Sequence, residues 1–302
     1  RDVLDIGYES RFDQYDILID KTMSLVPRKH RYVIDERTDV NGSIITSINK
    51  DPFYNLINKI KNENFESIAV GFLHSYANPE NEKILKAFLT KELPDVEVSV
   101  SSDVCPEIRE YERFTTTVVN AYIKPLMSNY LKKLDQKLLN SGFNCPLLLM
   151  TSGGTLTNIS SACNNPVRLV ESGPAGGAIL ATSIAEDMNL SKVISFDMGG
   201  TTAKITIIEN KKAIKAREFE VDRKARFKKG SGYPLRIPVI EMVEIGAGGG
   251  SIARVNKLEQ IITGPDSAGS FPGPACYSNG GSMPTITDAD LVIGKINPDN
   301  FA

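Results

Sequence analysis

The chain has 302 residues, of which 41% are hydrophobic and 24% are charged, with 35 Lys and Arg against 37 Asp and Glu. This length is enough for one large domain or two medium ones with substantial cores. A net charge of −2 gives no compositional case for nucleic-acid binding. Since no apolar run approaches the roughly 18 residues that a membrane span needs, we expect neither a nucleic-acid partner nor a membrane association.

The cysteines and histidines narrow the class of protein further. Four cysteines are scattered without C-x-x-C spacing, and only two histidines are present. Sparse cysteines in a long chain predict reduced thiols, and no charged-then-apolar leader marks the chain for export, so we expect a cytoplasmic protein. The two histidines disfavour a His-rich zinc site or a Ser-His-Asp hydrolase. The sequence begins with Arg1 and not with Met, and its first residues already carry a helical pattern. We interpret the chain as an internal fragment of a longer protein.

The first third of the chain alternates helix and strand signals. Apolar residues recur at helical spacing over residues 2–9, 52–62 and 80–92. A short apolar run at 67–74 and an alternating run at 96–100 predict two strands between these helices. This alternation indicates an α/β layered structure.

A long helix is predicted over residues 112–141, and Pro125 is expected to kink or restart it. Leucines and a tyrosine recur every four residues beyond Pro125 and predict a core-facing stripe. The stripe consists of Leu126, Tyr130, Leu134 and Leu138. Gly142 is a predicted helix stop, and a strand is expected at 147–150. We place a domain boundary near residue 118.

The strongest motif is VISFDMGGTTAKITII at residues 193–208. It predicts a strand ending at Asp197, a turn through two glycines, a returning strand, and a third, more exposed strand over 213–221. Glycine lets the backbone approach a ligand closely, and consecutive amides with threonine hydroxyls can donate to a phosphate. An aspartate at a strand end can orient a hydrated Mg²⁺ ion or an attacking water. An ordinary hairpin with a Gly-Gly turn is the alternative.

Three other glycine-containing segments are weaker signals. ESGPAGG at 171–177 leads into an Ala-rich helix over 178–187, IGAGGGS occupies 245–251, and a Pro- and Gly-rich loop spans 264–281. The segments at 245–251 and 264–281 could line a ligand, and 171–177 could open a helix that connects two halves of the fold. From local sequence alone, glycine-rich surface turns and a softened helix start are the better interpretations. The basic run at 223–229 is interpreted as a solvated loop rather than a nucleic-acid site.

Taken together, the motifs resemble those of the hydantoinase A and 5-oxoprolinase family. ESGPAGG, FDMGGTTAK, GAGGGSIA, SAGSFPGPACY and PTITDADLVIGKINPDNF occur in the family's order, and EIREYERFTTTVVNAYIKP at 107–125 is similar to its N-terminal domain. Lys204 and Glu241 stand where many members have Asp. By this resemblance, residues 1–118 are the C-terminal part of the N-terminal domain, and residues 119–302 are the N-terminal part of the hydantoinase A domain.

The resemblance implies an α/β actin-like ATPase (RNase H-like) fold of two halves, both incomplete in this chain. It implies ATP and Mg²⁺ as cofactors, and a reaction that opens five-membered cyclic amides or imides by phosphorylating the amide oxygen. Asp197 and Glu171 are the candidate catalytic residues, and Asp197 is also the candidate metal ligand. The candidate cofactor-binding residues are Gly199, Gly200, Thr201, Thr202, Lys204, Gly246, Gly248, Gly249 and Gly250.

The resemblance also implies a small cyclic amide as substrate, a hydantoinase B-type partner subunit and an oligomer. Two other functions stay open: a subunit of an ATP-dependent acetone or acetophenone carboxylase, and a non-catalytic actin-like ATP-binding module. The family's first phosphate hairpin would precede residue 1, and its adenosine-side glycine motif would follow residue 302. We therefore expect the 302-residue chain alone to be inactive, and its strands at 67–74 and 96–100 to leave an apolar sheet edge exposed.

Overall fold

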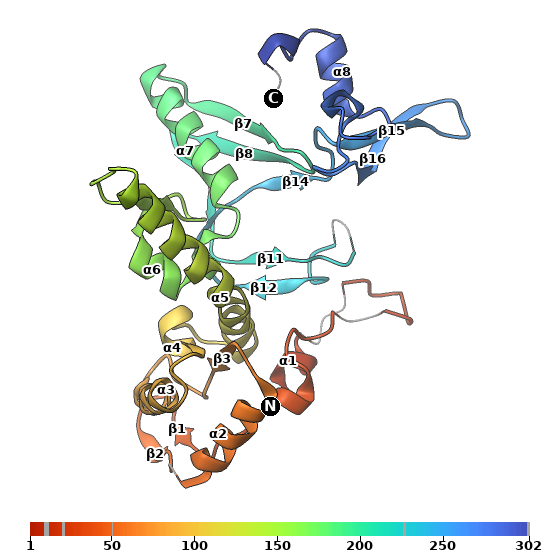
Figure 1. The fold of residues 1–302 in the computed structure, drawn as a ribbon. Helices are drawn as coiled ribbons and strands as arrows, with labels where there is room; N and C mark the ends of the chain where they lie inside the picture. The colour runs from red at the N-terminus through yellow and green to blue at the C-terminus, as the bar shows by residue number, and fades with distance from the viewer. Residues whose placement is uncertain (9–11, 20–21, 50, 226–227, 301–302) are drawn as a thin grey trace. The chain divides into compact units, whose positions relative to one another are not determined.

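The computed structural model describes residues 1–8, 12–19, 22–49, 51–225 and 228–300 (Figure 1). The chain forms two compact units. Unit 1 comprises Arg1–Ser172 and Ala216–Val239, and unit 2 comprises Gly173–Lys215 and Ile240–Ala302. The predicted sequence-domain boundary near residue 118 falls within a helix of unit 1. It stays a prediction, because the two units are defined by contacts and not by family domains.

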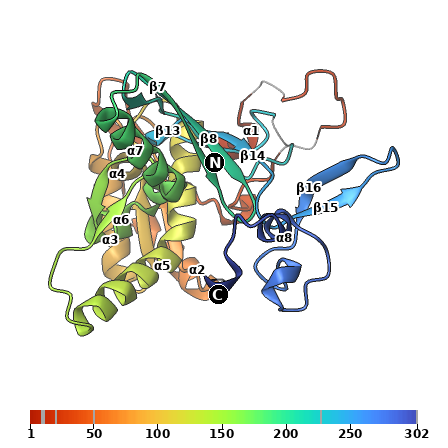
Figure 2. The same cartoon turned by 90° about the horizontal axis from the view of Figure 1, so that it is seen from above.

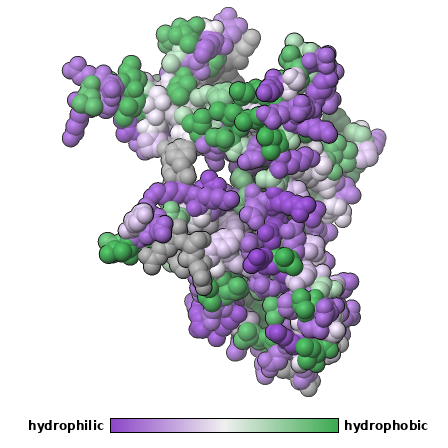
Figure 3. All heavy atoms as spheres, turned by 180° about the vertical axis from the view of Figure 1, so that it is seen from behind, coloured by the Kyte–Doolittle hydropathy of each residue, from purple (hydrophilic) through white to green (hydrophobic). Residues whose placement is uncertain are grey.

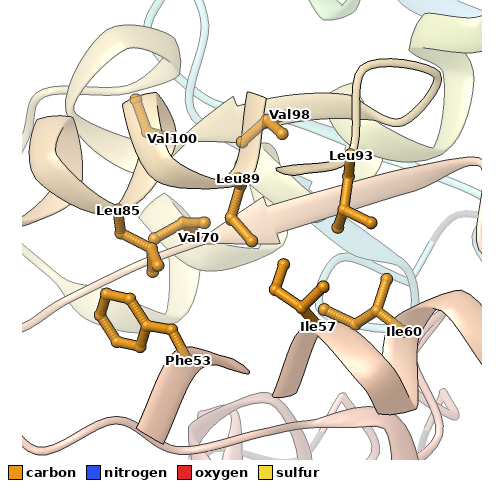
Figure 4. Packing of buried hydrophobic residues seen from close by; sticks show 9 residues of the cluster. All are labelled: Phe53, Ile57, Ile60, Val70, Leu85, Leu89, Leu93, Val98 and Val100. Carbon is orange, nitrogen blue, oxygen red and sulfur yellow. The ribbon is translucent and has the colours of Figure 1, made fainter. Parts of the chain in front are cut away.

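Unit 1 is built on two parallel strands, β3 (Ser67–Val70) and β4 (Glu97–Val100). Helices α2 (Asp51–Glu63) and α3 (Glu80–Glu92) pack against one face of this pair. Their apolar residues recur every three or four positions, so each helix presents one apolar stripe to the strands. Figure 4 shows the resulting core. Its buried members are Phe53, Ile57, Ile60, Val70, Leu85, Leu89, Leu93, Val98 and Val100.

The long helix α5 (Glu110–Asn140) contacts the same two strands, and its buried face is largely polar. The Asn120 amide donates to Ser99 and to the Asn164 carbonyl, and Lys124 donates to the Val98 carbonyl. The predicted apolar stripe is wrong, since Leu126 and Tyr130 are 75% and 58% exposed. The helix also runs through Pro125 without a restart. The physical reason is that side-chain hydrogen bonds, and not apolar contacts, satisfy most of the buried face.

The remaining elements of unit 1 are short. They are α1 (Val3–Ile6), η1 (Arg28–His30), β1 (Arg37–Thr38), β2 (Ile44–Thr46), α4 (Ser101–Val104), β5 (Leu148–Met150), β6 (Leu156–Asn158), α6 (Ile159–Asn164), η2 (Pro166–Leu169), β11 (Phe219–Val221) and β12 (Tyr233–Leu235). The chain passes between the units at β10 (Lys215–Ala216) and β13 (Val239–Ile240). None of the helices in the described ranges is both long and apolar enough to cross a membrane.

The basic run at 223–229 lies between β11 and β12, and its described residues carry ion pairs. Arg223 pairs with Glu220 over 2.6 Å, and Lys228 pairs with Asp13. Residues 226 and 227 lie outside the described residues. Two of the positive charges are therefore compensated locally by carboxylates.

Unit 2 contains an antiparallel sheet in the order β14–β8–β7. β7 (Lys192–Met198) and β8 (Ala203–Glu209) form the predicted hairpin, and β14 (Val243–Ile245) pairs with the start of β8. The predicted third strand over 213–221 is largely wrong, because only β9 (Lys212–Ala213) pairs with β8. The strand that pairs with β8 on the side away from β7 is β14, which lies about thirty residues further along the chain.

Helix α7 (Ser172–Asp187) lies along β7 and β8 in both views of the ribbon (Figures 1 and 2). Its small residues Ala175 and Ala178 are fully buried, as their lack of bulk allows a close approach. The opposite face of the sheet is apolar and exposed, and hydrophobic residues gather over this part of the surface in Figure 3. The exposed side chains are Ile194, Phe196, Met198, Ile207, Val243 and Ile245.

The rest of unit 2 follows β14. A glycine-rich loop leads into the hairpin of β15 (Ser251–Val255) and β16 (Ile261–Ser267). The Pro- and Gly-rich segment that follows contains the short helix η3 (Ala275–Tyr277), and the chain continues into α8 (Ile286–Val292) and η4 (Pro298–Asn300).

Candidate functional site

The β7–β8 hairpin brings Asp197 and a glycine turn to one end of the sheet. Asp197 is the penultimate residue of β7 and lies opposite Lys204 in the pairing with β8. The chain reverses over residues 199–202, where the Gly199 amide donates to the Thr202 carbonyl over 2.9 Å. The hairpin that the motif predicts is therefore present, with its carboxylate at the strand end.

Two consecutive amides of this turn have no acceptor among the residues that the structure describes. Within the described part of the chain, the amides of Gly200 and Thr201 donate no hydrogen bond, and both residues are exposed. Consecutive backbone amides in a turn make an anion-binding concavity. The Thr201 and Thr202 hydroxyls lie on the same turn and can add donors. The turn therefore has the groups that a phosphate would need.

The loop over residues 246–250 holds this turn from the backbone side. The amides of Gly249 and Gly250 donate to the carbonyls of Gly199 and Gly200 over 2.9 and 2.7 Å. A methyl group placed on Gly248 would lie 2.5 Å from the N and C atoms of Thr201. Only a residue without a side chain allows two backbones to approach this closely.

The glycines of this loop therefore pack against the turn and hold its backbone in place. The Gly248 amide donates to the Ser251 hydroxyl over 2.9 Å, so the amides of Gly248, Gly249 and Gly250 are all used inside the protein. Gly246 opens the loop directly after β14. Among the described residues, amides without a protein acceptor are therefore found in the turn at 199–202, whereas those of Gly248, Gly249 and Gly250 in the loop are bonded.

Helix α7 and β14 complete the surroundings of Asp197. Its Oδ2 atom lies 3.8 Å from the position of a methyl group on Gly177, so the helix passes close to the carboxylate. Lys204 lies on the same face of the sheet and pairs with Glu244 of β14, with Nζ 3.6 Å from Oε1. Directly opposed residues of an antiparallel pair have their Cβ atoms about 4.5–5.5 Å apart. Asp197 and Lys204 therefore lie side by side on one face of the sheet at this end.

The second candidate catalytic residue, Glu171, belongs to unit 1, whereas the hairpin belongs to unit 2. Its backbone has a φ of 60° in the turn before α7. A non-glycine residue in this left-handed region is uncommon and worth attention at a site. Glu241 is exposed just before β14, and its amide donates to the Ile214 carbonyl over 2.9 Å.

Asp288 organises the segment that supports the glycine loop, and the sequence analysis missed it. It accepts hydrogen bonds from the amides of Cys276 and Thr285, at 2.7 and 2.8 Å. Thr285 and Asp288 form a capping box at the start of α8. Thr287, two residues after the N-cap Thr285, donates its amide to the Gly249 carbonyl over 2.8 Å. The Thr-x-x-Asp spacing of a capping box was the available sequence signal.

The same contacts set the protonation of Asp288 and Cys276. Burial raises the pKa of Asp288, but hydrogen bonds from Cys276 and Thr285 outweigh it and hold the pKa at about 2. Burial and the hydrogen bond to Asp288 raise the pKa of the Cys276 thiol to about 11. Cys276 is therefore a neutral thiol at pH 7, the protonation state in which it can donate a hydrogen bond to Asp288.

Replacing Asp288 by asparagine should destabilise the 302-residue chain by ~1 kcal/mol, the usual cost of losing a helix cap. Because the folded pKa of Asp288 lies below its ordinary value, its stabilisation is complete above about pH 4 and is lost as the pH falls towards 2. Urea unfolding at pH 7 and pH 3 measures both effects. If the parent and the variant lost the same free energy of unfolding between pH 7 and pH 3, this role of Asp288 would be contradicted.

Models of two protein families match the chain. Residues 113–302 match the hydantoinase/oxoprolinase family, and residues 1–93 match the hydantoinase/oxoprolinase N-terminal region. The chain belongs to the hydantoinase/oxoprolinase family. The resemblance inferred from the motifs is thereby confirmed.

Three proteins illustrate what the chain is similar to. An uncharacterized protein of Methanocaldococcus jannaschii is 44% identical over 98% of this chain, which spans 44% of that protein. The crystal structure of ATP-dependent caprolactamase from Pseudomonas jessenii has a TM-score of 0.73 at 33% identity, covering 98% of this chain and 42% of that one. Nucleotide-free acetone carboxylase has a TM-score of 0.70 at 27% identity, covering 89% and 37%.

These neighbours confirm the predicted fold class, an α/β actin-like ATPase fold. The chain spans less than half the length of each of the three proteins. The family of the chain is therefore shown by its own residues.

Proposed function

We propose that this protein is an ATP-dependent hydrolase that opens five-membered cyclic amides or imides of the hydantoin or 5-oxoproline type. One observation carries the proposal. In a member of the hydantoinase/oxoprolinase family, strand β7 carries Asp197 at its penultimate position and leads directly into a turn with two amides that have no acceptor among the described residues. This is the combination of anion donors and a metal-orienting group that phosphoryl transfer requires.

The residues of the hairpin suit ATP and Mg²⁺. Gly199, Gly200, Thr201 and Thr202 would hold the phosphates through the turn, and Asp197 would orient the hydrated Mg²⁺ ion. Mg²⁺ usually keeps several waters and needs only one or two carboxylates besides the phosphates. A single carboxylate at the strand end fits this requirement. Among the described residues, no group of three His, Cys, Asp or Glu side chains could hold a metal ion by itself.

Lys204 would contribute positive charge at the site. Its ammonium group lies on the Asp197 face of the sheet and is partly neutralised by Glu244. A lysine there adds positive charge beside the developing negative charge of a transferred phosphoryl group. Glu171 remains our second candidate catalytic residue.

The expected chemistry follows from the low reactivity of an amide. Transfer of the γ-phosphoryl group from ATP to the amide oxygen releases ADP and converts the amide into an activated imidate. Water adds to the imidate carbon, and the ring C–N bond opens with the nitrogen leaving as an amine, which gives an acyl phosphate. A second water hydrolyses the acyl phosphate to the carboxylate and phosphate. The protein's contribution is to position the phosphoryl group and to balance its charge. We also propose that it acts with a hydantoinase B-type partner in an oligomer, since relatives are named as subunits of caprolactamase and of carboxylases. The four free cysteines are consistent with a cytoplasmic location.

Phosphate release by the protein expressed from its complete coding sequence, with and without a B-type partner, tests the proposal. We expect release that depends on 5-oxoproline or hydantoin and is matched by ring-opened product. Release that depends on a ketone and bicarbonate would assign the protein instead to the carboxylase subunits, the second candidate, which the likeness to acetone carboxylase supports. ATP binding without turnover on any of these substrates would favour the non-catalytic module.

A further inference from the structure

The chain contains two Asn-Gly pairs, Asn41–Gly42 and Asn279–Gly280, and the fold holds them differently. Asparagine is one of the thermolabile residues of proteins, and its side-chain amide is lost most readily before glycine. Glycine has no Cβ atom to shield its own backbone nitrogen, so that nitrogen can reach the asparagine side chain. Both asparagines are exposed. Exposure therefore does not distinguish the two pairs, and the hydrogen bonds of each glycine decide.

The Asn41–Gly42 pair is held from both sides. The Gly42 amide donates to the Asp39 carbonyl over 3.1 Å, and the Gly42 carbonyl accepts from the Asn78 side-chain amide over 2.8 Å. A methyl group placed on Gly42 would lie 3.3 Å from the Ala77 carbonyl oxygen, so the turn also packs against a neighbouring segment. The Gly42 nitrogen must leave its acceptor, and the turn must open, before it can attack Asn41.

The Asn279–Gly280 pair is held by neither kind of contact. Across the residues that the structure describes, the Gly280 amide donates no hydrogen bond and the Asn279 side chain makes none. A methyl group on Gly280 would have no atom within 4 Å. The next residue, Gly281, is by contrast packed against the Gly273 carbonyl with no room for a side chain. The pair is therefore an open tip on a loop whose base is tightly packed.

We propose that Asn279 is a site of spontaneous deamidation in the folded chain, and that the fold protects Asn41 from the same reaction. The Gly280 nitrogen attacks Cγ of Asn279, and the new N–Cγ bond forms as the Cγ–Nδ2 bond breaks. Nδ2 leaves as ammonia and takes up the proton of the Gly280 amide, which leaves a five-membered succinimide. The inference does not depend on the proposed catalytic function.

Water then opens the succinimide at either of its two carbonyl carbons. Addition at Cγ breaks the new N–Cγ bond and gives aspartate at position 279. Addition at the main-chain carbonyl carbon breaks the original peptide bond and gives isoaspartate, in which the backbone runs through Cβ and Cγ. Both products add one negative charge to the loop over residues 264–281. The first step requires loss of the Gly280 amide proton, so its rate should rise with pH.

Peptide mapping by mass spectrometry on the 302-residue chain tests this inference. The chain is incubated at a mildly alkaline pH, folded in one sample and unfolded in guanidinium chloride in the other. In the unfolded sample Asn41 and Asn279 should convert at similar rates, because only their sequence neighbours act there. In the folded sample Asn279 should stay close to its unfolded rate. Asn41 should slow by at least ~10-fold, because its turn must first open.

Two controls identify the site and the mechanism. Gly280→Ala places a Cβ atom beside the attacking nitrogen, so it should slow the conversion of Asn279 in both samples and leave Asn41 at its parent rate. Digestion with a protease that cleaves before aspartate, but not before isoaspartate, separates the two products. Ring closure should yield both of them.

Three results would overturn the inference. Conversion of Asn279 in the folded chain that is as slow as that of Asn41 would show that the loop is protected. Equally rapid conversion of both asparagines in the folded chain would show that the hydrogen bonds of Gly42 do not decide the rate. Formation of aspartate without any isoaspartate would indicate direct hydrolysis of the side-chain amide and not attack by the Gly280 nitrogen.

Discussion

Replacing Asp197 by asparagine should lower the rate of ATP hydrolysis at least ~10²-fold, the usual effect of removing a positioned catalytic carboxyl group. The amide retains the shape of the side chain but loses the negative charge that, in the proposed function, would orient a hydrated Mg²⁺ ion. Asp197 is only half-buried, so the fold should tolerate the change. The measurement is phosphate release by protein made from the complete coding sequence, at saturating ATP and substrate.

Glu209→Gln is the matched control for this experiment. Glu209 is an exposed carboxylate at the far end of β8, in the same hairpin as Asp197. Its loss should leave the rate within about twofold of the parent, since exposed substitutions away from a site have small effects. If Asp197→Asn kept more than half of the parent rate with an unchanged melting temperature, the hairpin would not be the catalytic phosphate site.

Local pattern was sufficient for the helices α2 and α3 and for the hairpin. In each helix, one apolar stripe of period 3.6 decides which face is buried, and the structure places the helices within about a residue of the predicted ranges. The hairpin combines two apolar strands with a Gly-Gly turn, which leaves few other conformations. These elements are determined by residues close together in the sequence.

Helix α5 shows why the same reasoning fails elsewhere. Its buried side chains are largely polar, and several of them bond to partners far along the chain. Asn120, for example, also accepts from the Val167 amide over 3.2 Å, and Lys124 pairs with Glu97 over 3.1 Å. A search for apolar periodicity selects Leu126 and Tyr130 instead, which are exposed. Only the tertiary contacts reveal that the polar face is the inner one.

The candidate site shows the same division between local and distant information. The motif identified Asp197 and the turn, because strand, glycines and threonines are adjacent in sequence. It could not show that Gly249 and Gly250 bond to the turn's carbonyls, since about fifty residues separate the partners. Nor could it place β14, which takes the sheet position expected for residues 213–221. Glycine motifs predict close backbone approach, but not what is approached.

Replacing Gly248 by alanine should destabilise unit 2 by ~1–3 kcal/mol, the usual cost of forcing extra atoms into a packed region. The added methyl group would lie 2.5 Å from the N and C atoms of Thr201 and 2.6 Å from the C atom of Gly200. All three are backbone atoms and cannot rotate away. The turn must therefore move, which would also raise the KM for ATP if the turn holds its phosphates.

Gly173→Ala is the control that isolates this clash. Gly173 lies in α7, and a methyl group there would have no atom within 4 Å. Alanine favours helix over glycine by up to about 1 kcal/mol, but a side chain on the residue before Pro174 disfavours the helical conformation and opposes this gain. This variant should therefore stay within about 1 kcal/mol of the parent in stability. Urea unfolding of both variants measures the stability, and ATP titration of protein made from the complete coding sequence measures the KM. If Gly248→Ala unfolded at the same urea concentration as Gly173→Ala, the loop would not be packed against the turn. If its stability fell while the KM stayed at the parent value, the loop would support the fold and the turn would not bind the phosphates.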